Sequence, residues 1–110
     1  MQDINGAIEH LNKSVKIDSL VIDSHFHLGE TYALNKEHQK SIEALNKAVK
    51  LGHKSPLAYY DLAIEYYNLN EYSEALSNIN LAKWRNSMYP RKGLDDELNQ
   101  FQNIIVNKMK

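Results

Sequence analysis

The feature that most constrains this chain is a stretch of sequence that occurs twice with a fixed offset. Residues between positions 25 and 48 return 34 positions later as identical or similar residues. The six pairs are Leu28 and Leu62, Gly29 and Ala63, Tyr32 and Tyr66, Ser41 and Ala75, Leu45 and Ile79, and Ala48 and Ala82. A self-similarity of this period is typical of stacked helical repeats, in which each unit buries its apolar face against the next. The pattern therefore predicts an all-α solenoid and favours protein binding as the class of function.

The composition is that of an ordinary globular domain without an extreme charge. Of the 110 residues, 43% are apolar and 25% are charged, and the formal net charge is -1. Without an overall basic field, we do not expect the chain to hold nucleic acid through its phosphates. The absence of cysteine excludes disulfides and the commonest structural zinc sites, and it mildly favours a reducing compartment such as the cytoplasm. The apolar runs are too short to span a bilayer, and the first residues lack the order of a signal peptide, so we expect no membrane insertion.

Apolar residues spaced three and four apart predict helices in the first half of the chain. The offset of 34 aligns a helix over residues 1–17 with the second helix of a repeat, so this stretch is interpreted as a half repeat. Asp18 and Ser19 are good N-cap residues for the helix that follows. The first full repeat, residues 22–55, then pairs a helix from about Leu20 to Leu34 with one from about Glu37 to Leu51. Asn35 and Lys36 form the turn between them, and Gly52 is placed to end the second helix in the left-handed conformation.

The second full repeat, residues 56–89, is predicted to copy the first. Ser55 is an N-cap residue, and Pro56 occupies the first helical position, where its missing N–H costs nothing. That helix reaches about Leu69, and Asn70 caps the next helix, which is predicted from Glu71 to about Arg85. The offset fails after Ser87, where Pro90 leads into a last helix within residues 90–110. Its predicted packed stripe is Leu94, Leu98, Phe101, Ile105 and Met109.

The repeated residues resemble the tetratricopeptide repeat. The resemblance is carried by small residues where paired helices must approach closely and by large residues between them. The two motifs are His25-x-x-Leu28-Gly29-x-x-Tyr32 and Tyr59-x-x-Leu62-Ala63-x-x-Tyr66. The chain departs from the family pattern at its usual tryptophan position, which holds His25 and Tyr59, and at its closing proline, which both repeats lack. The resemblance implies a single domain over residues 1–110, folded as a right-handed superhelical solenoid of antiparallel helix pairs. It would have about six helices, with residues 90–110 as the capping helix.

The first helix of the second repeat carries a second apolar stripe, formed by Leu57, Tyr60, Ile64 and Tyr67. The corresponding line of the first repeat is Asp23, Phe26, Glu30, Ala33 and Leu34. In tetratricopeptide-repeat proteins this line faces the concave groove in which peptides or helices bind. The alternative is that these side chains fill the joint between neighbouring first helices and pack mainly on each other. Aromatic anchors in a concave surface are typical of binding hot spots. The candidate partner-binding residues are Phe26, Glu30, Leu57, Tyr60, Ile64 and Tyr67.

The charge of this line predicts the chemistry of the partner. No Lys or Arg lies within residues 20–34 or 56–69, which instead hold Asp23, Glu30, Asp61 and Glu65. The best-known groove chemistry of the family is a clamp of Lys, Arg and Asn for the acidic C-terminal tail of heat-shock chaperones. Those positions hold Phe26, Glu30, Tyr60 and Ile64 here, so a carboxylate would meet repulsion and no paired donor. We therefore predict a protein or peptide partner with apolar anchors and a basic residue for Glu30, and no binding of an acidic chaperone tail.

The sequence contains no pattern that predicts catalysis, a cofactor or a metal site. His25 and His27 are two residues apart, so on a helix they point in nearly opposite directions and cannot share a metal ion. Asp95, Asp96 and Glu97 fan around the start of the last helix, where acidic residues suit the helix dipole. The chain also lacks a Gly-rich phosphate loop, a serine elbow and a catalytic carboxylate spacing. We therefore expect it not to be an enzyme.

Two further interpretations remain open. One basic and aromatic neighbourhood could contact RNA or an acidic partner, although an exposed rim around a packed Trp84 is favoured. Its residues are Lys83, Trp84, Arg85, Arg91 and Lys92. In the other interpretation, the half repeat over residues 1–17 leaves Ile4, Ile8 and Leu11 uncovered by the rest of this sequence. These residues would then pack either against an upstream repeat of a longer array or against a second copy of the chain. Light scattering would distinguish a stable dimer through residues 1–17 from a monomer that binds through the groove.

Overall fold

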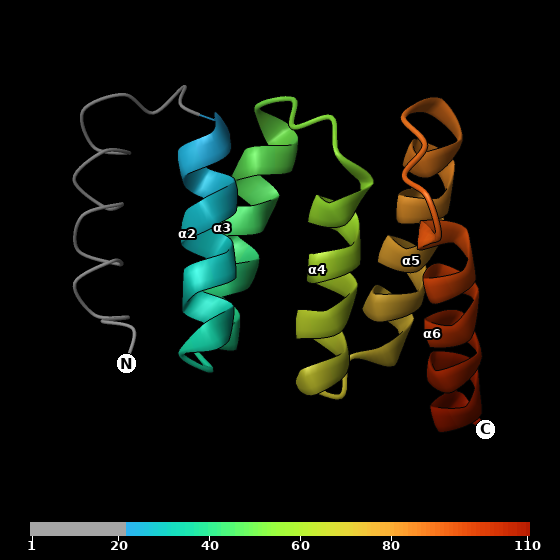
Figure 1. The fold of residues 1–110 in the computed structure, drawn as a ribbon. Helices are drawn as coiled ribbons and strands as arrows, with labels where there is room; N and C mark the ends of the chain where they lie inside the picture. The colour runs from blue at the N-terminus through green and yellow to red at the C-terminus, as the bar shows by residue number, and fades with distance from the viewer. Residues whose placement is uncertain (1–21) are drawn as a thin grey trace. The chain divides into compact units, whose positions relative to one another are not determined.

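The computed structural model describes residues 22–110, which contain five α-helices and no strand (Figure 1). The helices are α2 (Ile22–Leu34), α3 (His38–Lys50), α4 (Pro56–Asn68), α5 (Tyr72–Met88) and α6 (Leu94–Met109). The all-α class is therefore confirmed for the described residues. The helix expected over residues 1–17, the caps at Asp18 and Ser19, and the proposed self-association surface lie outside the described residues.

The chain divides into two compact units with a boundary between His53 and Lys54. In the first unit α2 packs against α3, which gives the predicted hairpin. In the second unit α5 packs against both α4 and α6, so that the last helix lies alongside α5 (Figure 1).

The first hairpin is held together at a close approach of its two helices. A Cβ atom on residue 29 would lie 2.6 Å from Cγ of Leu45, so Gly29 is the residue that allows this approach. The buried hydroxyl of Ser41 donates a hydrogen bond of 2.7 Å to the carbonyl oxygen of Gly29. Seven of the eight residues predicted to face inward are buried: His25, Leu28, Gly29 and Tyr32 on α2, and Ile42, Leu45 and Ala48 on α3. Val49, the eighth, is only half-buried.

The helix ends confirm two of the predicted turns and correct a third. Gly52 has a φ of 101°, the left-handed conformation that glycine adopts without strain. Ser55 accepts a hydrogen bond from the N–H of Leu57 across Pro56, as predicted for an N-cap. Asn70 was predicted to cap α5, but Glu71 occupies the N-cap position. The reason is that Asn70 has a φ of 62° and closes the end of α4, where its N–H bonds the Tyr67 carbonyl.

The core of the second unit joins α4, α5 and α6 around small residues of α5. The buried cluster contains Ala63, Ala75, Ile79, Ala82, Leu94, Leu98 and Ile105. Helix α5 reaches Met88, beyond the predicted end at Arg85, and stops before Pro90, because the residue preceding a proline disfavours the helical conformation. Met109 was predicted to belong to the packed stripe of α6, but it is 46% exposed because the helix ends at this residue.

The buried side chain of Asn86 connects α5 to the start of α6. Its amide nitrogen donates to Oδ1 of Asp95 at 2.9 Å, and its oxygen accepts from the backbone N–H of Arg91 at 2.8 Å. These two bonds hold the turn that carries Tyr89 and Pro90 on the end of the bundle. The turn is therefore an ordered part of the second unit.

Trp84 was expected to be packed, and the structure corrects this. The indole is 52% exposed. The inward positions of α5 are Ala75, Ile79, Ala82 and Asn86, and Trp84 lies on a different side of the helix.

Candidate functional site

The second apolar stripe of α4 lies beside α6. Tyr60, Ile64 and Tyr67 are half-buried, and with Asn68 they form one wall of a hollow of about 430 Å³. The other wall comes from α6 and consists of Glu97, Gln100, Phe101 and Ile104. We call these eight residues the aromatic hollow.

Edge-to-face contacts between aromatic rings organise the hollow. The Phe101 ring centroid lies 5.9 Å from that of Tyr60 and 5.3 Å from that of Tyr67, with interplanar angles of 64° and 77°. Tyr67 in turn contacts Tyr72 at 5.6 Å. Aromatic pairs prefer this geometry because the positive edge of one ring meets the negative face of the other. The rings are thus held in fixed orientations while the tyrosines keep part of their surface accessible.

Three of the six residues chosen from the sequence meet at this hollow, and the other three do not. Leu57 is half-buried against the core of the second unit and does not line the hollow. Phe26 and Glu30 belong to the first unit. Phe26 is only 8% exposed, and its ring stacks on the His53 imidazole at a centroid distance of 4.4 Å.

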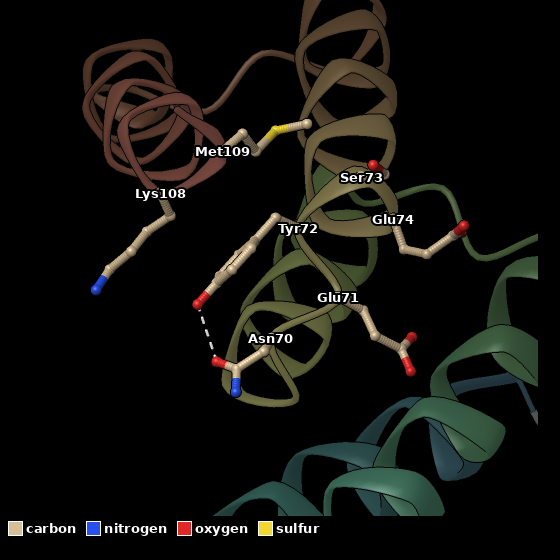
Figure 2. Close-up of a pocket in the computed structure, with 7 residues that line it drawn as sticks. All are labelled: Asn70, Glu71, Tyr72, Ser73, Glu74, Lys108 and Met109. Atoms are coloured by element: carbon tan, nitrogen blue, oxygen red, sulfur yellow. Dashed lines mark hydrogen bonds between the residues drawn. The ribbon is translucent and has the colours of Figure 1, made fainter.

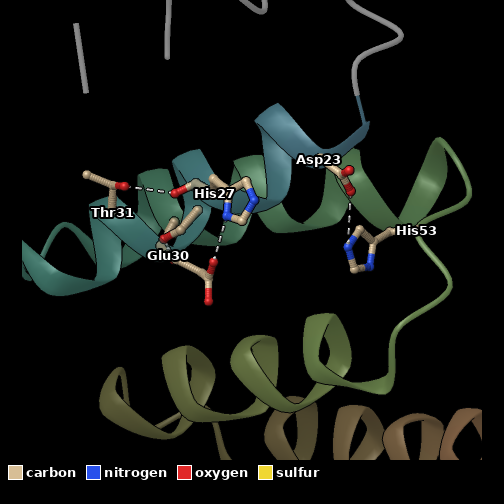
Figure 3. Close-up of polar contacts among 7 residues, drawn as sticks. Asp23, His27, Glu30, Thr31 and His53 are labelled. Carbon is tan, nitrogen blue, oxygen red and sulfur yellow. Dashed lines mark hydrogen bonds and ion pairs between the residues drawn. The ribbon is translucent and has the colours of Figure 1, made fainter. Parts of the chain in front are cut away.

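The surroundings of Glu30 are polar (Figure 3). Its Oε1 atom lies 3.1 Å from Nδ1 of His27, one helical turn away, and both side chains are largely exposed. The Thr31 hydroxyl donates to the carbonyl oxygen of His27 at 2.8 Å, and His53 Nε2 lies 3.9 Å from Oδ1 of Asp23. Glu30 is therefore accessible to a basic group from a partner.

The α6 wall of the hollow was not predicted from the sequence. Phe101 was assigned to the packed stripe of the last helix, and Glu97 to its N-terminal charge. The signal that could have found them is spacing, because Glu97, Phe101 and Ile104 follow one another at four and three residues, as Tyr60, Ile64 and Tyr67 do on α4. Ile104 is 50% exposed and therefore adds an accessible aliphatic side chain to this wall.

The electrostatic character of the hollow is acidic. Glu97 is the charged residue among those that line it, and the lining contains no Lys or Arg. Burial raises the pKa of the Tyr60 hydroxyl above its ordinary value, and the carboxylates of Glu97 and Asp61 raise it further. An anion brought to this position would be repelled, whereas a cation would be stabilised.

A second hollow, of about 620 Å³, lies at the turn between α4 and α5 beside the end of α6 (Figure 2). The Tyr72 hydroxyl donates to Oδ1 of Asn70 at 2.9 Å. The carboxylates of Glu71 and Glu74 point away from the Lys108 ammonium group (Figure 2). No set of acid, base or nucleophile converges here. Across residues 22–110 no group of three His, Asp or Glu side chains is placed to hold a metal ion.

Comparison with known proteins identifies the repeat. Residues 22–51 match the family model of the tetratricopeptide repeat. A TPR repeat-containing protein of Methanocaldococcus jannaschii is 36% identical over 70 residues, which are 64% of this chain and 12% of that protein. Residues 22–51 are therefore a tetratricopeptide repeat, and these matches support a tetratricopeptide-repeat protein. The chain spans only a small part of this curated relative, so the relative's length extends far beyond the matched repeats.

Solved tetratricopeptide-repeat structures have the same fold. MamA superimposes with a TM-score of 0.86 and 26% identity, covering 97% of this chain and 59% of MamA. The type III secretion translocator chaperone SycD of Yersinia enterocolitica gives a TM-score of 0.90 at 18% identity, covering 96% of this chain and 74% of SycD. The TPR2B domain of yeast Sti1 gives 0.88 at 17% identity, covering 96% and 85% of the two chains. These similarities confirm a tetratricopeptide-repeat solenoid as the fold class.

The repeat supports a function in general terms only. Tetratricopeptide repeats are generally non-enzymatic scaffolds, and the fold supports protein–protein interaction as the general class of function. In the portion of the chain that the structure describes, no helix combines the length and the apolar character needed to cross a bilayer.

The raised pKa of Tyr60 leads to a prediction about alkaline pH. The folded pKa lies above the unfolded value of about 10, so the folded chain binds more protons in this range. The neutral Tyr60 hydroxyl therefore contributes its full share to the free energy of unfolding at pH values below the unfolded pKa. This contribution is lost as the pH rises through the folded pKa of Tyr60. Glu97→Gln should shift the Tyr60 titration to lower pH, although burial should keep its pKa above the ordinary value. NMR of the tyrosine Cζ carbons measures this, and Glu74→Gln is the control. An unchanged Tyr60 midpoint in Glu97→Gln would contradict the assignment.

Proposed function

We propose that the aromatic hollow binds a short segment of a partner protein that carries apolar anchors and a basic residue. The observation that supports this most strongly is the position of Phe101, 5.9 Å from Tyr60 and 5.3 Å from Tyr67. The three rings come from two helices and are held by one another, so a partner side chain would find a preorganised surface. Preorganisation lowers the entropic cost of binding.

The apolar anchors of the partner would contact the accessible sides of these rings and the exposed side chain of Ile104. Aromatic residues that are held rigidly in a concave surface contribute much of the binding energy in known interfaces. The hollow is shallow and open, so an extended or helical segment suits it better than a small enclosed ligand. The basic residue would lie next to Glu97, where the carboxylate also raises the Tyr60 pKa.

The first unit carries a separate candidate contact at Glu30. Its carboxylate is accessible beside His27, so it can pair with a basic residue of a partner. Phe26 is buried against His53, so its role would be to stabilise the first unit beside Glu30. Leu57 would likewise stabilise α4 by packing against the core of the second unit. We retain the cytoplasm as the expected location, because the chain contains no cysteine.

The same acidic character argues against an acidic tail as the occupant. The TPR2B domain of yeast Sti1 forms a complex with pHsp70, which is consistent with a protein partner for a chain of this fold. In the present chain the aromatic hollow is lined by Glu97 and by no cation, so it lacks the donors that a terminal carboxylate needs.

The proposal is tested by selecting short peptides on the purified chain and titrating the selected sequences. We expect peptides that combine aromatic or aliphatic residues with Lys or Arg. Tyr60→Ala and Tyr67→Ala should each lower the affinity for these peptides by about 10-fold or more, the range of a hot-spot residue. Tyr60→Phe should retain most of the affinity, because the ring contact with Phe101 is kept.

The matched control is Tyr89→Ala, which removes an exposed tyrosine that does not line the hollow. Circular dichroism of each variant shows whether the helices are intact. Basic apolar peptides that bind Tyr60→Ala and Tyr67→Ala as tightly as the original chain would contradict the proposal.

A further inference from the structure

Helix α5 carries an exposed apolar stripe that the proposed function does not use. Leu81, Trp84, Met88 and Tyr89 are between 41% and 52% exposed. Their spacing of three, four and one places them along one side of the helix and at its end. None of these residues lines the aromatic hollow. Several large apolar side chains exposed along one side of a helix mark a candidate interaction surface.

Cations accompany the stripe. The Arg85 guanidinium lies over three aromatic rings, with its central carbon 5.7 Å from the Tyr59 centroid, 5.2 Å from Trp84 and 6.0 Å from Tyr89. The Nε atom of Arg85 is buried and has no hydrogen-bond partner. The stacking against the rings orients the guanidinium, because the electron-rich faces of the rings attract it.

The stripe ends in a third hollow, of about 460 Å³, that is also cationic. Met88, Tyr89 and Pro90 form its apolar part. Lys54 and Arg91 line it as well, and no carboxylate does. Among the described residues no carboxylate forms an ion pair with Lys54, Arg85 or Arg91. We call Leu81, Trp84, Arg85, Met88, Tyr89, Lys54 and Arg91 the α5 face.

The carboxylates of Asp95 and Asp96, at the start of α6, form no ion pair with the cations of the α5 face. Asp95 accepts a hydrogen bond from the Asn86 amide and is held at the start of α6, where it also interacts with the helix dipole. Asp96 is exposed in the same first turn. Three cations in an apolar environment favour an anionic ligand. They disfavour a second copy of the same face, because the two copies would bring like charges together.

We propose that the α5 face binds an acidic amphipathic segment of a protein partner. Carboxylates of the segment would pair with Arg85, Lys54 and Arg91, and its apolar side chains would cover Leu81, Trp84 and Met88. A protein segment fits better than nucleic acid, because Leu81 and Met88 offer aliphatic contact area that bases do not use for stacking. This inference is independent of the aromatic hollow, whose charge is opposite and whose occupant is basic.

The inference is compatible with the predicted exclusion of an acidic chaperone tail. That prediction concerns a terminal carboxylate held by a clamp on the first helices of the repeats, where Glu30 and Tyr60 stand instead. The α5 face lies on the second helix of a repeat and on the loop residues beside the end of that helix, and it would bind side-chain carboxylates together with apolar anchors. The two ligands differ in chemistry and in the surface that they contact.

Trp84 allows a direct test, because it is the single tryptophan of the chain. Its emission is followed while short tryptophan-free peptides with capped ends are added. One peptide combines Asp and Glu with Leu and Phe, the second replaces the acids by Lys, and the third replaces the apolar residues by Ser. Uridine oligonucleotides form a fourth arm. We expect a blue shift and protection from acrylamide quenching with the first peptide only, and weaker binding at high salt.

Charge reversal identifies the face. Lys54→Glu combined with Arg91→Glu should lower the affinity for the acidic apolar peptide by about 10-fold or more, because close charge pairs at interfaces have large coupling energies. The matched control is Lys47→Glu combined with Lys110→Glu, which makes the same charge change at exposed positions on α3 and at the last residue. Tyr60→Ala should leave this binding unchanged, which separates it from the proposed function.

Several results would overturn the inference. Equal affinity of the acidic apolar peptide for the Lys54→Glu, Arg91→Glu variant would place binding elsewhere. An equal spectral response to the lysine peptide or to uridine oligonucleotides would reject an acidic protein segment as the occupant. A blue shift that grows with protein concentration in the absence of peptide would assign the face to a second copy of the chain.

Discussion

Replacing Leu98 by alanine is expected to lower the free energy of unfolding by about 2–5 kcal/mol, the range for truncating a fully buried leucine. The side chain is 0% exposed in the second turn of α6. Its neighbours in the buried cluster include Ala63, Ala75 and Ala82. Alanine side chains have no rotamers with which to fill a new cavity, so the cost should not fall at the low end of this range.

Urea unfolding measures this effect, and Trp84 emission reports the transition from α5, against which α6 packs. The matched control is Val106→Ala on the same helix, where the side chain is 37% exposed and the change should cost well under 1 kcal/mol, or about the effect of an ordinary surface substitution. A Leu98→Ala midpoint equal to that of Val106→Ala would show that α6 contributes little to the core of the second unit.

Gly29→Ala is expected to destabilise the first hairpin by about 1–3 kcal/mol, the cost of overpacking a core. Alanine in place of glycine inside a helix would by itself stabilise it by about 1 kcal/mol. The close approach outweighs this gain, because the new Cβ would lie 2.6 and 2.7 Å from Cγ and Cδ2 of Leu45 and 3.3 Å from its backbone nitrogen. Leu45 is fully buried and cannot swing away, and its backbone cannot move without α3.

Far-ultraviolet circular dichroism follows this variant, since the single tryptophan lies in the second unit. The second hairpin supplies a rescue, because it has Ala63 and Ile79 where the first has Gly29 and Leu45. Gly29→Ala combined with Leu45→Ile should therefore recover part of the lost stability. A Gly29→Ala protein as stable as the original chain would mean that α2 and α3 separate at no cost, which would contradict the role of Gly29.

The sequence by itself determined the two hairpins and the faces that they bury. The offset of 34 aligns Gly29 with Ala63 and Leu45 with Ile79, and these residues are buried where predicted. Local chemistry also determined the turn at Gly52, since a left-handed residue at a helix end is selected by backbone sterics within a few residues. Both signals are local or periodic, so they can be recognised in one dimension.

The tertiary structure alone decided which neighbours the remaining faces meet. The spacing on α4 shows that Tyr60, Ile64 and Tyr67 share a stripe. It does not predict that Phe101, from a helix outside the repeat, contacts the two tyrosines. The exposure of Trp84 is a similar case, because an aromatic residue on a helix is compatible with burial until the positions of α4 and α6 are known. Periodicity encodes the direction in which a side chain points along its own helix. What lies in that direction depends on the docking of other helices, which is a property of the folded chain.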